Sequence, residues 1–293
     1  MAKETRGTTG KVLYEKIAKR KTAIITINNP EHRNIYGPEL GGGMELAVIE
    51  ALDDPEVWTI ILTGAGEIAF CAGNDLKSFK RTSDAHERGE GRPLGGARRI
   101  FEEDRGGGRV PIKGAGRGSI LLGHGCQEKP IIAAINGLCF GGGLEMAAGC
   151  DIRIASENAT FQQSEPKRGM IAGVTPAKLT RLIPFNLALE LLLTCRVYTA
   201  QEAYRIGLVN KVVPLKELIP AALAMCDEIN ENAPLAIRDV KEAAWDGLLF
   251  YPTLSESIEN NSRLLHEHAY LSEDCKEGMR AFVEKRKPVW KGR

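Results

Sequence analysis

The chain of 293 residues is 43% hydrophobic and 26% charged, a balance typical of a water-soluble globular protein and unlike that of a disordered or membrane-embedded chain. Its 39 basic and 38 acidic side chains leave a formal net charge of +1, so no global field favours nucleic acid or an anionic membrane as the partner. The length suits one main α/β domain followed by a helical tail.

Two alternating, β-branched runs open the patterned part of the chain. The runs 12–17 and 22–28 are separated by a polar stretch and predict a β-hairpin. Helical apolar spacing follows at 38–53, although glycines from Gly41 onward weaken the start of this helix, and a strand is predicted at 57–63. The order so far is strand, strand, helix, strand.

A second unit of the same kind follows a long insertion. Its predicted elements are a buried strand at 129–137, a glycine turn at 141–143, a short apolar helix at 144–148 and a strand at 151–155. Strands that alternate with helices indicate a layered α/β fold with crossover connections. Between the units, residues 81–128 hold 12 glycines and 8 arginines with little apolar periodicity, which predicts a long loop or lid rather than core.

The last third of the chain is predicted to be mainly helical. Its predicted helices are 188–194, 200–206, 216–231, 235–248, 253–270 and 272–286, with a strand at 208–213. Ser272 is the predicted N-cap of the last helix.

The cysteines and histidines indicate neither disulfides nor a metal. Seven scattered cysteines without CxxC spacing are typical of reduced intracellular thiols: Cys71, Cys126, Cys139, Cys150, Cys195, Cys226 and Cys275. The five histidines include no HExxH pair, so no metal is expected. The first eleven residues lack an apolar signal core, and no apolar run approaches the roughly 18 residues of a membrane span, so we expect a cytoplasmic protein.

The first motif with chemical potential is the run from Ala69 to Lys77, where a strand and turn lead into a polar stretch. Gly73 lets the backbone approach a ligand closely, and free N–H groups of Asn74 and Asp75 could donate to an anion. Taken alone, an ordinary helix-capping turn explains this run better.

The second motif is the glycine triplet that follows the strand 129–137. Gly141 to Gly143 open an apolar helix and aim unpaired N–H groups and the positive helix end at one point, which suits a developing oxyanion. Glu145 then stands among apolar residues, where a carboxylate costs several kcal/mol unless it is paired or used. The alternative is a structural glutamate paired with an arginine or with backbone.

The third motif carries Glu165, just after a predicted strand exit. By spacing alone, a surface acid beside Lys167 and Arg168 explains it best. However, Glu145 and Glu165 end consecutive strand units, and two such carboxylates could flank one substrate as base and acid if their pKa values are pushed apart.

Five segments together carry a resemblance to a known family. They are AFCAGNDLK, KPIIAAINGLCFGGGLEMAAGCDIRIAS, ATFQQSEPKRG, ELLLTCRVYTAQEAYRIGLVNKVVP and EGMRAFVEKRKPVW. In this order they resemble the crotonase, or enoyl-CoA hydratase/isomerase, superfamily, with only the insertion unmatched. The resemblance implies an α/β fold, the crotonase ββα spiral. It divides the chain into a flexible N-terminus at 1–11, a spiral core at 12–215 with the 81–128 lid, and a helical trimerisation region at 216–293.

The resemblance also implies a site and a reaction. In the family two peptide N–H groups form an oxyanion hole for the thioester carbonyl, and on this sequence they fall at Asn74 and Gly142. The two glutamates of the family's hydratases match Glu145 and Glu165, which favours hydration of an enoyl-CoA with these residues as the acid/base pair.

Further residues are implied to lie close to coenzyme A or the substrate. They are Arg33, Ala72, Gly73, Asp75, Leu76, Lys77 and Gly141. No separate cofactor or metal is implied, since coenzyme A is part of the substrate. The family habit implies a homotrimer or a dimer of trimers, with neither a membrane nor a nucleic acid as partner.

Several residues around the implied acyl pocket depart from the family pattern. Alanine is commoner than Asn74 in the hydratases, Ser164 replaces the usual proline, and Ala172-Gly-Val-Thr-Pro departs from a glycine-rich run. Isomerisation of a double bond, or hydrolytic opening of a cyclic acyl-CoA, therefore stays as the alternative reaction. Outside enzymes the alternative is a non-catalytic RNA- or protein-binding family member, against which the near-neutral charge and both glutamates argue.

Overall fold

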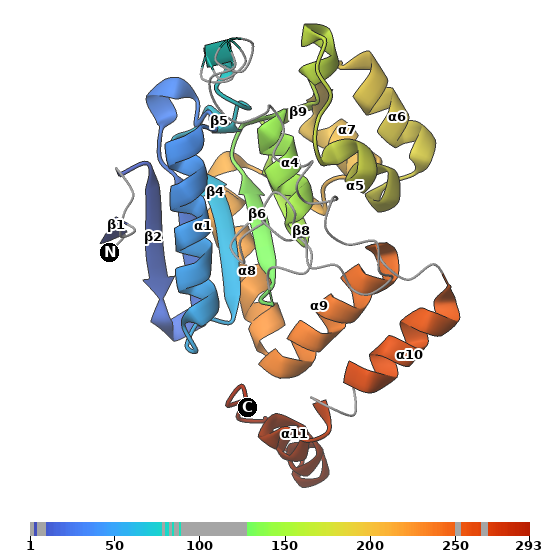
Figure 1. Cartoon of the computed structure of the whole chain (residues 1–293). Helices are drawn as coiled ribbons and strands as arrows, with labels where there is room; N and C mark the ends of the chain where they lie inside the picture. The colour runs from blue at the N-terminus through green and yellow to red at the C-terminus, as the bar shows by residue number, and fades with distance from the viewer. Residues whose placement is uncertain are drawn as a thin grey trace.

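The computed structural model shows two β-sheets surrounded by helices (Figure 1). It describes residues 3–4, 10–77, 80, 81, 84, 88, 128–249, 253–264 and 269–293. The predicted lid at 81–128 falls almost wholly outside the described residues and stays a prediction. Of the predicted flexible terminus at 1–11, residues 3, 4, 10 and 11 are described, and Lys3–Glu4 form a strand rather than a flexible segment.

The main sheet runs in the order β1-β2-β3-β4-β6-β8-β11. Its strands are β1 (Lys3–Glu4), β2 (Val12–Ile17), β3 (Thr22–Ile27), β4 (Thr59–Gly64), β6 (Ile131–Ile135), β8 (Ile152–Ser156) and β11 (Lys211–Val213). The predicted hairpin is confirmed, because β2 and β3 pair antiparallel. From β3 onward every neighbour is parallel.

Helices cover the main sheet on both faces. α1 (Pro38–Asp53) packs on β2 and β3, and α8 (Leu218–Asn230) packs behind β4, β6 and β8 (Figure 1). Alternate side chains of one strand therefore enter different cores: Leu62 packs in the α1 cluster and Ile61 in the α8 cluster. Strands buried on both faces are apolar throughout, which is why their sequences stand out as unbroken runs.

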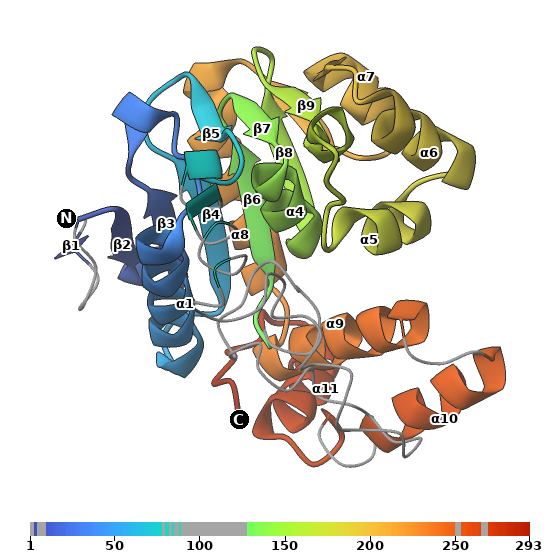
Figure 2. The ribbon, with the colours of Figure 1, turned by 45° about the horizontal axis from the view of Figure 1, so that its top comes forward.

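A second, smaller sheet of very short strands runs in the order β10-β9-β7-β5. Its members are β5 (Ala69–Cys71), β7 (Leu138–Phe140), β9 (Thr160–Gln162) and β10 (Tyr198–Thr199). Three of them directly follow a strand of the main sheet, β5 after β4, β7 after β6 and β9 after β8, and lie side by side in parallel (Figure 2). The chain thus winds as a spiral in which each turn adds one strand to each sheet.

Further described helices surround the two sheets. They are α4 (Gly142–Gly149), α5 (Thr175–Leu182), α6 (Phe185–Thr194), α7 (Ala200–Arg205), α9 (Pro234–Leu249), α10 (Leu254–Leu264) and α11 (Glu273–Glu284). All but α5 were predicted. The predicted cap of α11 is confirmed, since the Ser272 hydroxyl accepts the Cys275 N–H at 3.0 Å.

Two strand boundaries differ from the prediction for a tertiary reason. β4 begins at Thr59 rather than at 57 because its ladder partner β3 begins opposite, at Thr22. β11 begins at Lys211 rather than at 208, because the carbonyl of Leu208 accepts the Arg153 Nε–H at 2.6 Å instead of joining the ladder.

Asp151 joins the C-terminal helices to the spiral core. Its carboxylate accepts the backbone N–H of Ile131 and the indole N–H of Trp245, both at 2.7 Å. The Lys241 ammonium lies 2.8 Å from the same carboxylate, and its side chain is only 9% exposed. One loop residue before β8 thereby bonds to both β6 and α9.

We expect Asp151→Ala to lower the free energy of unfolding by about 3 kcal/mol, because it leaves two N–H donors without their acceptor and removes the carboxylate beside a nearly buried ammonium, which keeps its bond to the Lys129 carbonyl at 2.8 Å. The control is Asp227→Ala, which removes an ion pair with Arg20 whose side chains are 43% and 47% exposed. That control should cost no more than about 1 kcal/mol. Urea denaturation of both variants measures the difference, and equal losses would contradict the anchoring role.

Candidate active site

The segment after β5 is held by a single bridge to the chain before α1. Tyr36 donates its N–H to the Gly73 carbonyl and accepts the Asp75 N–H, both at 2.7 Å. In such a parallel bridge the residue between the two bonded neighbours turns its own N–H to the other side. The Asn74 N–H therefore faces away from Tyr36, toward the side of β5 on which β7 lies.

This bridge corrects one prediction made from the sequence. The Asp75 N–H was predicted to be free for an anion, but it is bonded to the Tyr36 carbonyl. The Asp75 carboxylate instead accepts the Lys77 N–H at 3.0 Å and so closes the turn locally. Of the two predicted donors in this turn, the Asn74 N–H faces the side of β7.

The N-terminus of α4 supplies unpaired donors beside this turn. Gly141 has a φ of +52°, and the first helical bond runs from the Glu145 N–H to the Gly141 carbonyl at 3.0 Å. The N–H groups of Gly142, Gly143 and Leu144 precede that bond and have no partner within the helix. A Cβ on Gly142 would lie 2.6 Å from the Asn74 Oδ1, so these two residues are in contact.

Glu145 lies one turn into α4 and is only 7% exposed. Its Oε1 accepts the N–H of Val174 at 2.7 Å, at the start of α5. Burial raises the pKa of Glu145 above 4.5 and the charge of Glu165 adds to this, while hydrogen bonds from backbone N–H groups of residues 173–175 oppose it. The alternative was a structural glutamate paired with an arginine or with backbone. Glu145 does bond to backbone N–H groups, but within the described residues no arginine pairs with it.

The raised pKa of Glu145 predicts a pH-dependent cost to folding. Because the folded pKa exceeds the unfolded value of 4.5, the stability contributed by Glu145 is fully present below pH 4.5 and is lost as the pH rises through the folded pKa. We therefore expect the free energy of unfolding of Glu145→Gln, relative to that of wild type, to be higher at about pH 8 than at about pH 4. Urea unfolding at both pH values measures this, and a constant difference would contradict it.

Glu165 faces the same cavity from the start of a short 3-10 helix, Glu165–Arg168. Its Oε2 accepts the side-chain amide of Gln163, which is only 1% exposed. A Cβ on Gly141 would lie 2.7 Å from Oε1 of Glu165, so this carboxylate packs directly on the glycine turn. It is half-buried, unlike the exposed Lys167 and Arg168 beside it, and the interpretation as a plain surface acid is wrong.

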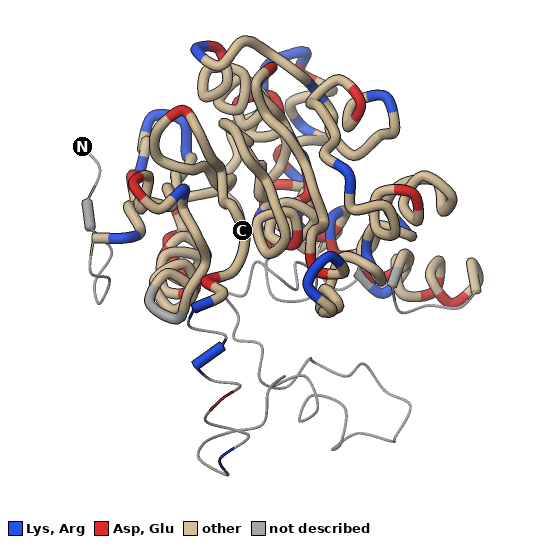
Figure 3. The backbone as a smooth tube through the Cα atoms, turned by 90° about the horizontal axis from the view of Figure 1, so that it is seen from above, with Lys and Arg blue, Asp and Glu red and all other residues tan. Residues whose placement is uncertain are grey.

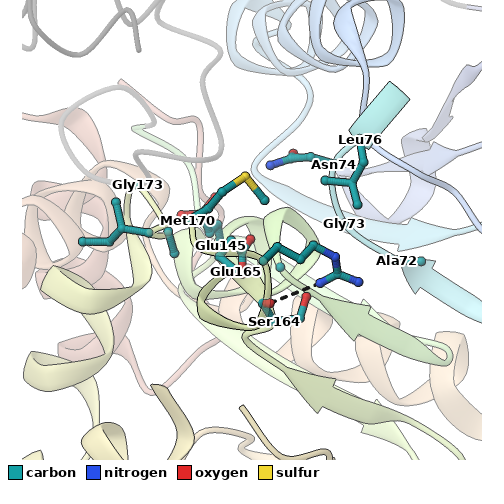
Figure 4. A pocket seen from close by; sticks show the side chains of 13 residues that line it. Ala72, Gly73, Asn74, Leu76, Glu145, Ser164, Glu165, Met170 and Gly173 are labelled. Atoms are coloured by element: carbon teal, nitrogen blue, oxygen red, sulfur yellow. Dashed lines mark hydrogen bonds between the residues drawn. The ribbon is translucent and has the colours of Figure 1, made fainter. Parts of the chain in front are cut away.

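A cavity of about 140 Å³ brings most of the predicted site residues together. Its lining residues are Ala72, Gly73, Asn74, Leu76, Gly141, Glu145, Ser164, Glu165, Arg168, Met170, Ile171, Ala172 and Gly173. Figure 4 shows Glu145 and Glu165 next to each other, with Asn74 and Leu76 to one side and Met170 and Gly173 to the other. Two carboxylates thus share one small space.

Four predicted residues lie outside the lining of this cavity. Gly142 adjoins it through its contact with Asn74. Arg33 is exposed and meets the site only through its carbonyl, which accepts the Ala72 N–H at 3.1 Å. Asp75 and Lys77 follow the cavity-lining turn, and Lys77 is exposed.

One wall of the cavity was predicted only in part, since the resemblance placed Ser164 and the run from Ala172 around the acyl pocket but gave no role to Arg168 or to residues 170–171. It consists of Arg168, whose guanidinium donates to the Ser164 carbonyl at 3.1 Å, and of the stretch 170–173. The available signal was their position, since Ser164 and 170–173 flank Glu165 and lead into α5.

The fold and the cavity define an α/β spiral protein with a carboxylate-lined pocket where the strands of its small sheet end. The sequence model of the enoyl-CoA hydratase/isomerase family matches residues 18–94 and 125–293, and the chain belongs to this family. The unmatched internal stretch, 95–124, lies within the predicted lid, and residues 1–17 also lie outside the match.

Individual relatives agree with this assignment. The chain is 36% identical to the short-chain-enoyl-CoA hydratase of Clostridium acetobutylicum, over 91% of this chain and 93% of the relative. It is 34% identical to the (E)-benzylidenesuccinyl-CoA hydratase of Thauera aromatica, over 92% and 95% of the two chains. The crystal structure of an enoyl-CoA hydratase from Bacillus anthracis superposes with a TM-score of 0.81 at 30% identity, covering 97% of this chain and 100% of that one.

Proposed function

We propose that this protein hydrates the double bond of an enoyl-CoA thioester. The observation that carries the proposal is the pair Glu145 and Glu165 in one small cavity, beside backbone donors at Asn74 and Gly142. Membership of the enoyl-CoA hydratase/isomerase family supports the substrate class. Relatives named short-chain-enoyl-CoA and crotonyl-CoA hydratase support hydration as the reaction.

The thioester oxygen would accept hydrogen bonds from the N–H groups of Asn74 and Gly142. Negative charge grows on this oxygen when water adds to Cβ, so fixed donors stabilise the transition state more than the bound substrate. Each donor is worth about 3 kcal/mol of transition-state stabilisation. The positive end of α4 adds to the effect.

The two glutamates would move the protons. In our assignment Glu145 takes a proton from the water whose oxygen bonds to Cβ, and Glu165 delivers a proton to Cα of the enolate. Burial and the charge of Glu165 raise the pKa of Glu145, so its carboxylate is a stronger base toward the water than a solvent-exposed carboxylate would be.

The test is incubation of the purified protein with linear, branched and cyclic enoyl-CoA thioesters, with products identified by mass. We expect a gain of one water that disappears in Glu145→Gln and Glu165→Gln. Absence of turnover with every thioester would refute the proposal.

One observation keeps a second reaction as a candidate. The Asn74 side chain lines the cavity where hydratases more often have alanine, so a different acyl group or a different fate of the enolate fits the site. Isomerisation would leave the product mass unchanged with a shifted double bond, and ring-opening hydrolysis would add one water to a cyclic β-diketone thioester while breaking a C–C bond.

The same proposal includes an assembly and a location. Exposed apolar side chains gather on the C-terminal helices, with Leu254 77%, Phe282 84% and Val283 79% exposed, and we propose that the region 216–293 packs against further copies in a trimer or dimer of trimers. In the described part of the chain no helix is long and apolar enough to cross a membrane.

We propose cytoplasmic action without a separate cofactor. The described cysteines are free thiols, which favours a reducing compartment. Basic and acidic residues intersperse over the described chain (Figure 3), which favours small acyl-CoA molecules over nucleic acid as ligands.

A further inference from the structure

We infer that Tyr36 is a positioning residue for the Asn74 N–H, and that its contact with Gly41 of helix α1 sets where that donor points. The inference rests on the proposed oxyanion role of Asn74. Tyr36 does not line the cavity itself, so it would act only through its neighbours.

The backbone of Tyr36 is the direct support of the turn that carries Asn74. Its N–H and carbonyl bond to Gly73 and Asp75, the residues on either side of Asn74, and both bonds measure 2.7 Å. Two bonds that flank one peptide group fix both its position and its tilt. A displacement of Tyr36 would therefore pass directly to the Asn74 N–H.

The side chain of Tyr36 is in turn held by the first turns of α1. Its ring packs against the main core cluster. A Cβ at Gly41 would lie 2.6 Å from the Tyr36 hydroxyl oxygen, closer than real Cβ atoms come to a neighbour, and 3.0 Å from Cζ, which is also a tight contact. The ring thus occupies the space that a side chain at position 41 would need.

This contact gives a reason for a glycine that is otherwise unfavourable. Glycine is a poor helix former, and Gly41 weakens the helical pattern of α1. The neighbouring Gly42 has open space around it, with nothing within 4 Å of a Cβ placed there. Gly41 and Gly42 are therefore adjacent in the same helix, but only a side chain at position 41 would contact Tyr36.

The expected consequence concerns rate rather than binding. An oxyanion donor is effective only when it meets the position that the charged oxygen will occupy, and misplacement by about 1 Å can cost a factor of about 10² in rate. This donor acts mainly in the transition state, so the KM should change much less than kcat.

The experiment compares Gly41→Ala with Gly42→Ala, Tyr36→Phe and the double variant Gly41→Ala/Tyr36→Phe. We expect Gly41→Ala to lower kcat by about 10- to 100-fold, while Gly42→Ala stays within about twofold of wild type. The double variant should recover most of the loss relative to Tyr36→Phe, since removing the hydroxyl removes the closest contact.

Two further readouts separate positioning from a merely structural effect. The clash with Tyr36 lowers stability while the higher helix propensity of alanine restores about 1 kcal/mol, so the unfolding temperature of Gly41→Ala should stay above the assay temperature and the loss of rate should not come from unfolding. The infrared carbonyl stretch of bound butyryl-CoA, a saturated thioester, should shift less from its free value in Gly41→Ala than in wild type, because a misplaced donor polarises the carbonyl less.

A wild-type kcat in Gly41→Ala would overturn the inference, and so would an equal loss of kcat in Gly42→Ala. A double variant with a kcat no higher than that of Gly41→Ala would also overturn it. Each of these outcomes leaves the proposed hydration intact, provided the wild-type protein turns over enoyl-CoA. Absence of turnover by the wild type would defeat the proposed function first and this inference with it.

Discussion

Exchanging Glu145 for glutamine is expected to lower kcat by about 10³-fold and to leave the KM for enoyl-CoA within about threefold of wild type. Glutamine keeps the shape of the side chain, and its carbonyl oxygen can still accept the Val174 N–H that lies 2.7 Å from Glu145. It cannot take a proton from water. The loss would therefore fall on the chemical step.

The Glu145→Gln variant should not lose activity by unfolding. The raised pKa of Glu145 means that its charged form destabilises the folded state at neutral pH, so glutamine should stabilise it there. A fall in kcat together with a rise in unfolding temperature would identify a group retained for chemistry at the expense of stability.

Glu165→Gln is expected to behave in the same way, since Gln163 can turn its amide to bond either side chain. The matched control is Glu157→Gln, an exposed glutamate in the turn after β8, which should keep full activity. A kcat close to that of wild type in Glu145→Gln or Glu165→Gln, measured with the best thioester of the panel, would contradict the acid/base role of that glutamate.

The second large effect is expected at Gly141. Gly141→Ala should lower kcat by at least about 10²-fold, because the new Cβ would lie 2.7 Å from Glu165 Oε1 and push that carboxylate out of place. The φ of +52° with ψ of −119° is a conformation that L-residues rarely adopt and adds about 1–3 kcal/mol of backbone strain for alanine, at the start of the helix that carries Gly142 and Glu145.

Gly207 separates the steric effect from the backbone strain. It has a φ of +79°, a Cβ placed on it would meet nothing within 4 Å, and it lies between α7 and β11, away from the cavity. Gly207→Ala should therefore lose stability in urea denaturation through its positive φ but keep its kcat. Equal losses of kcat in the two variants would show that strain alone, rather than contact with Glu165, explains the effect.

Much of this protein could be predicted from local pattern. The helix at 38–53 and the hairpin before it were predicted because their periodicity is a property of each segment alone. Glu145 was recognisable because a carboxylate within an apolar helix is costly wherever that helix lies. The order of the motifs along the chain also predicted the family, which the match to residues 18–94 and 125–293 confirms.

The tertiary structure decided the features that depend on what lies opposite. Strands of two or three residues, such as β7 and β10, carry too little pattern to be recognised and exist because they pair with neighbouring strands. The Asp75 N–H was predicted to be free and is not, because Tyr36, distant in sequence, accepts it. The carboxylate of Glu145 is held by the N–H of Val174, 29 residues further along the chain, and hydrogen bonds between distant segments leave no local trace in the sequence.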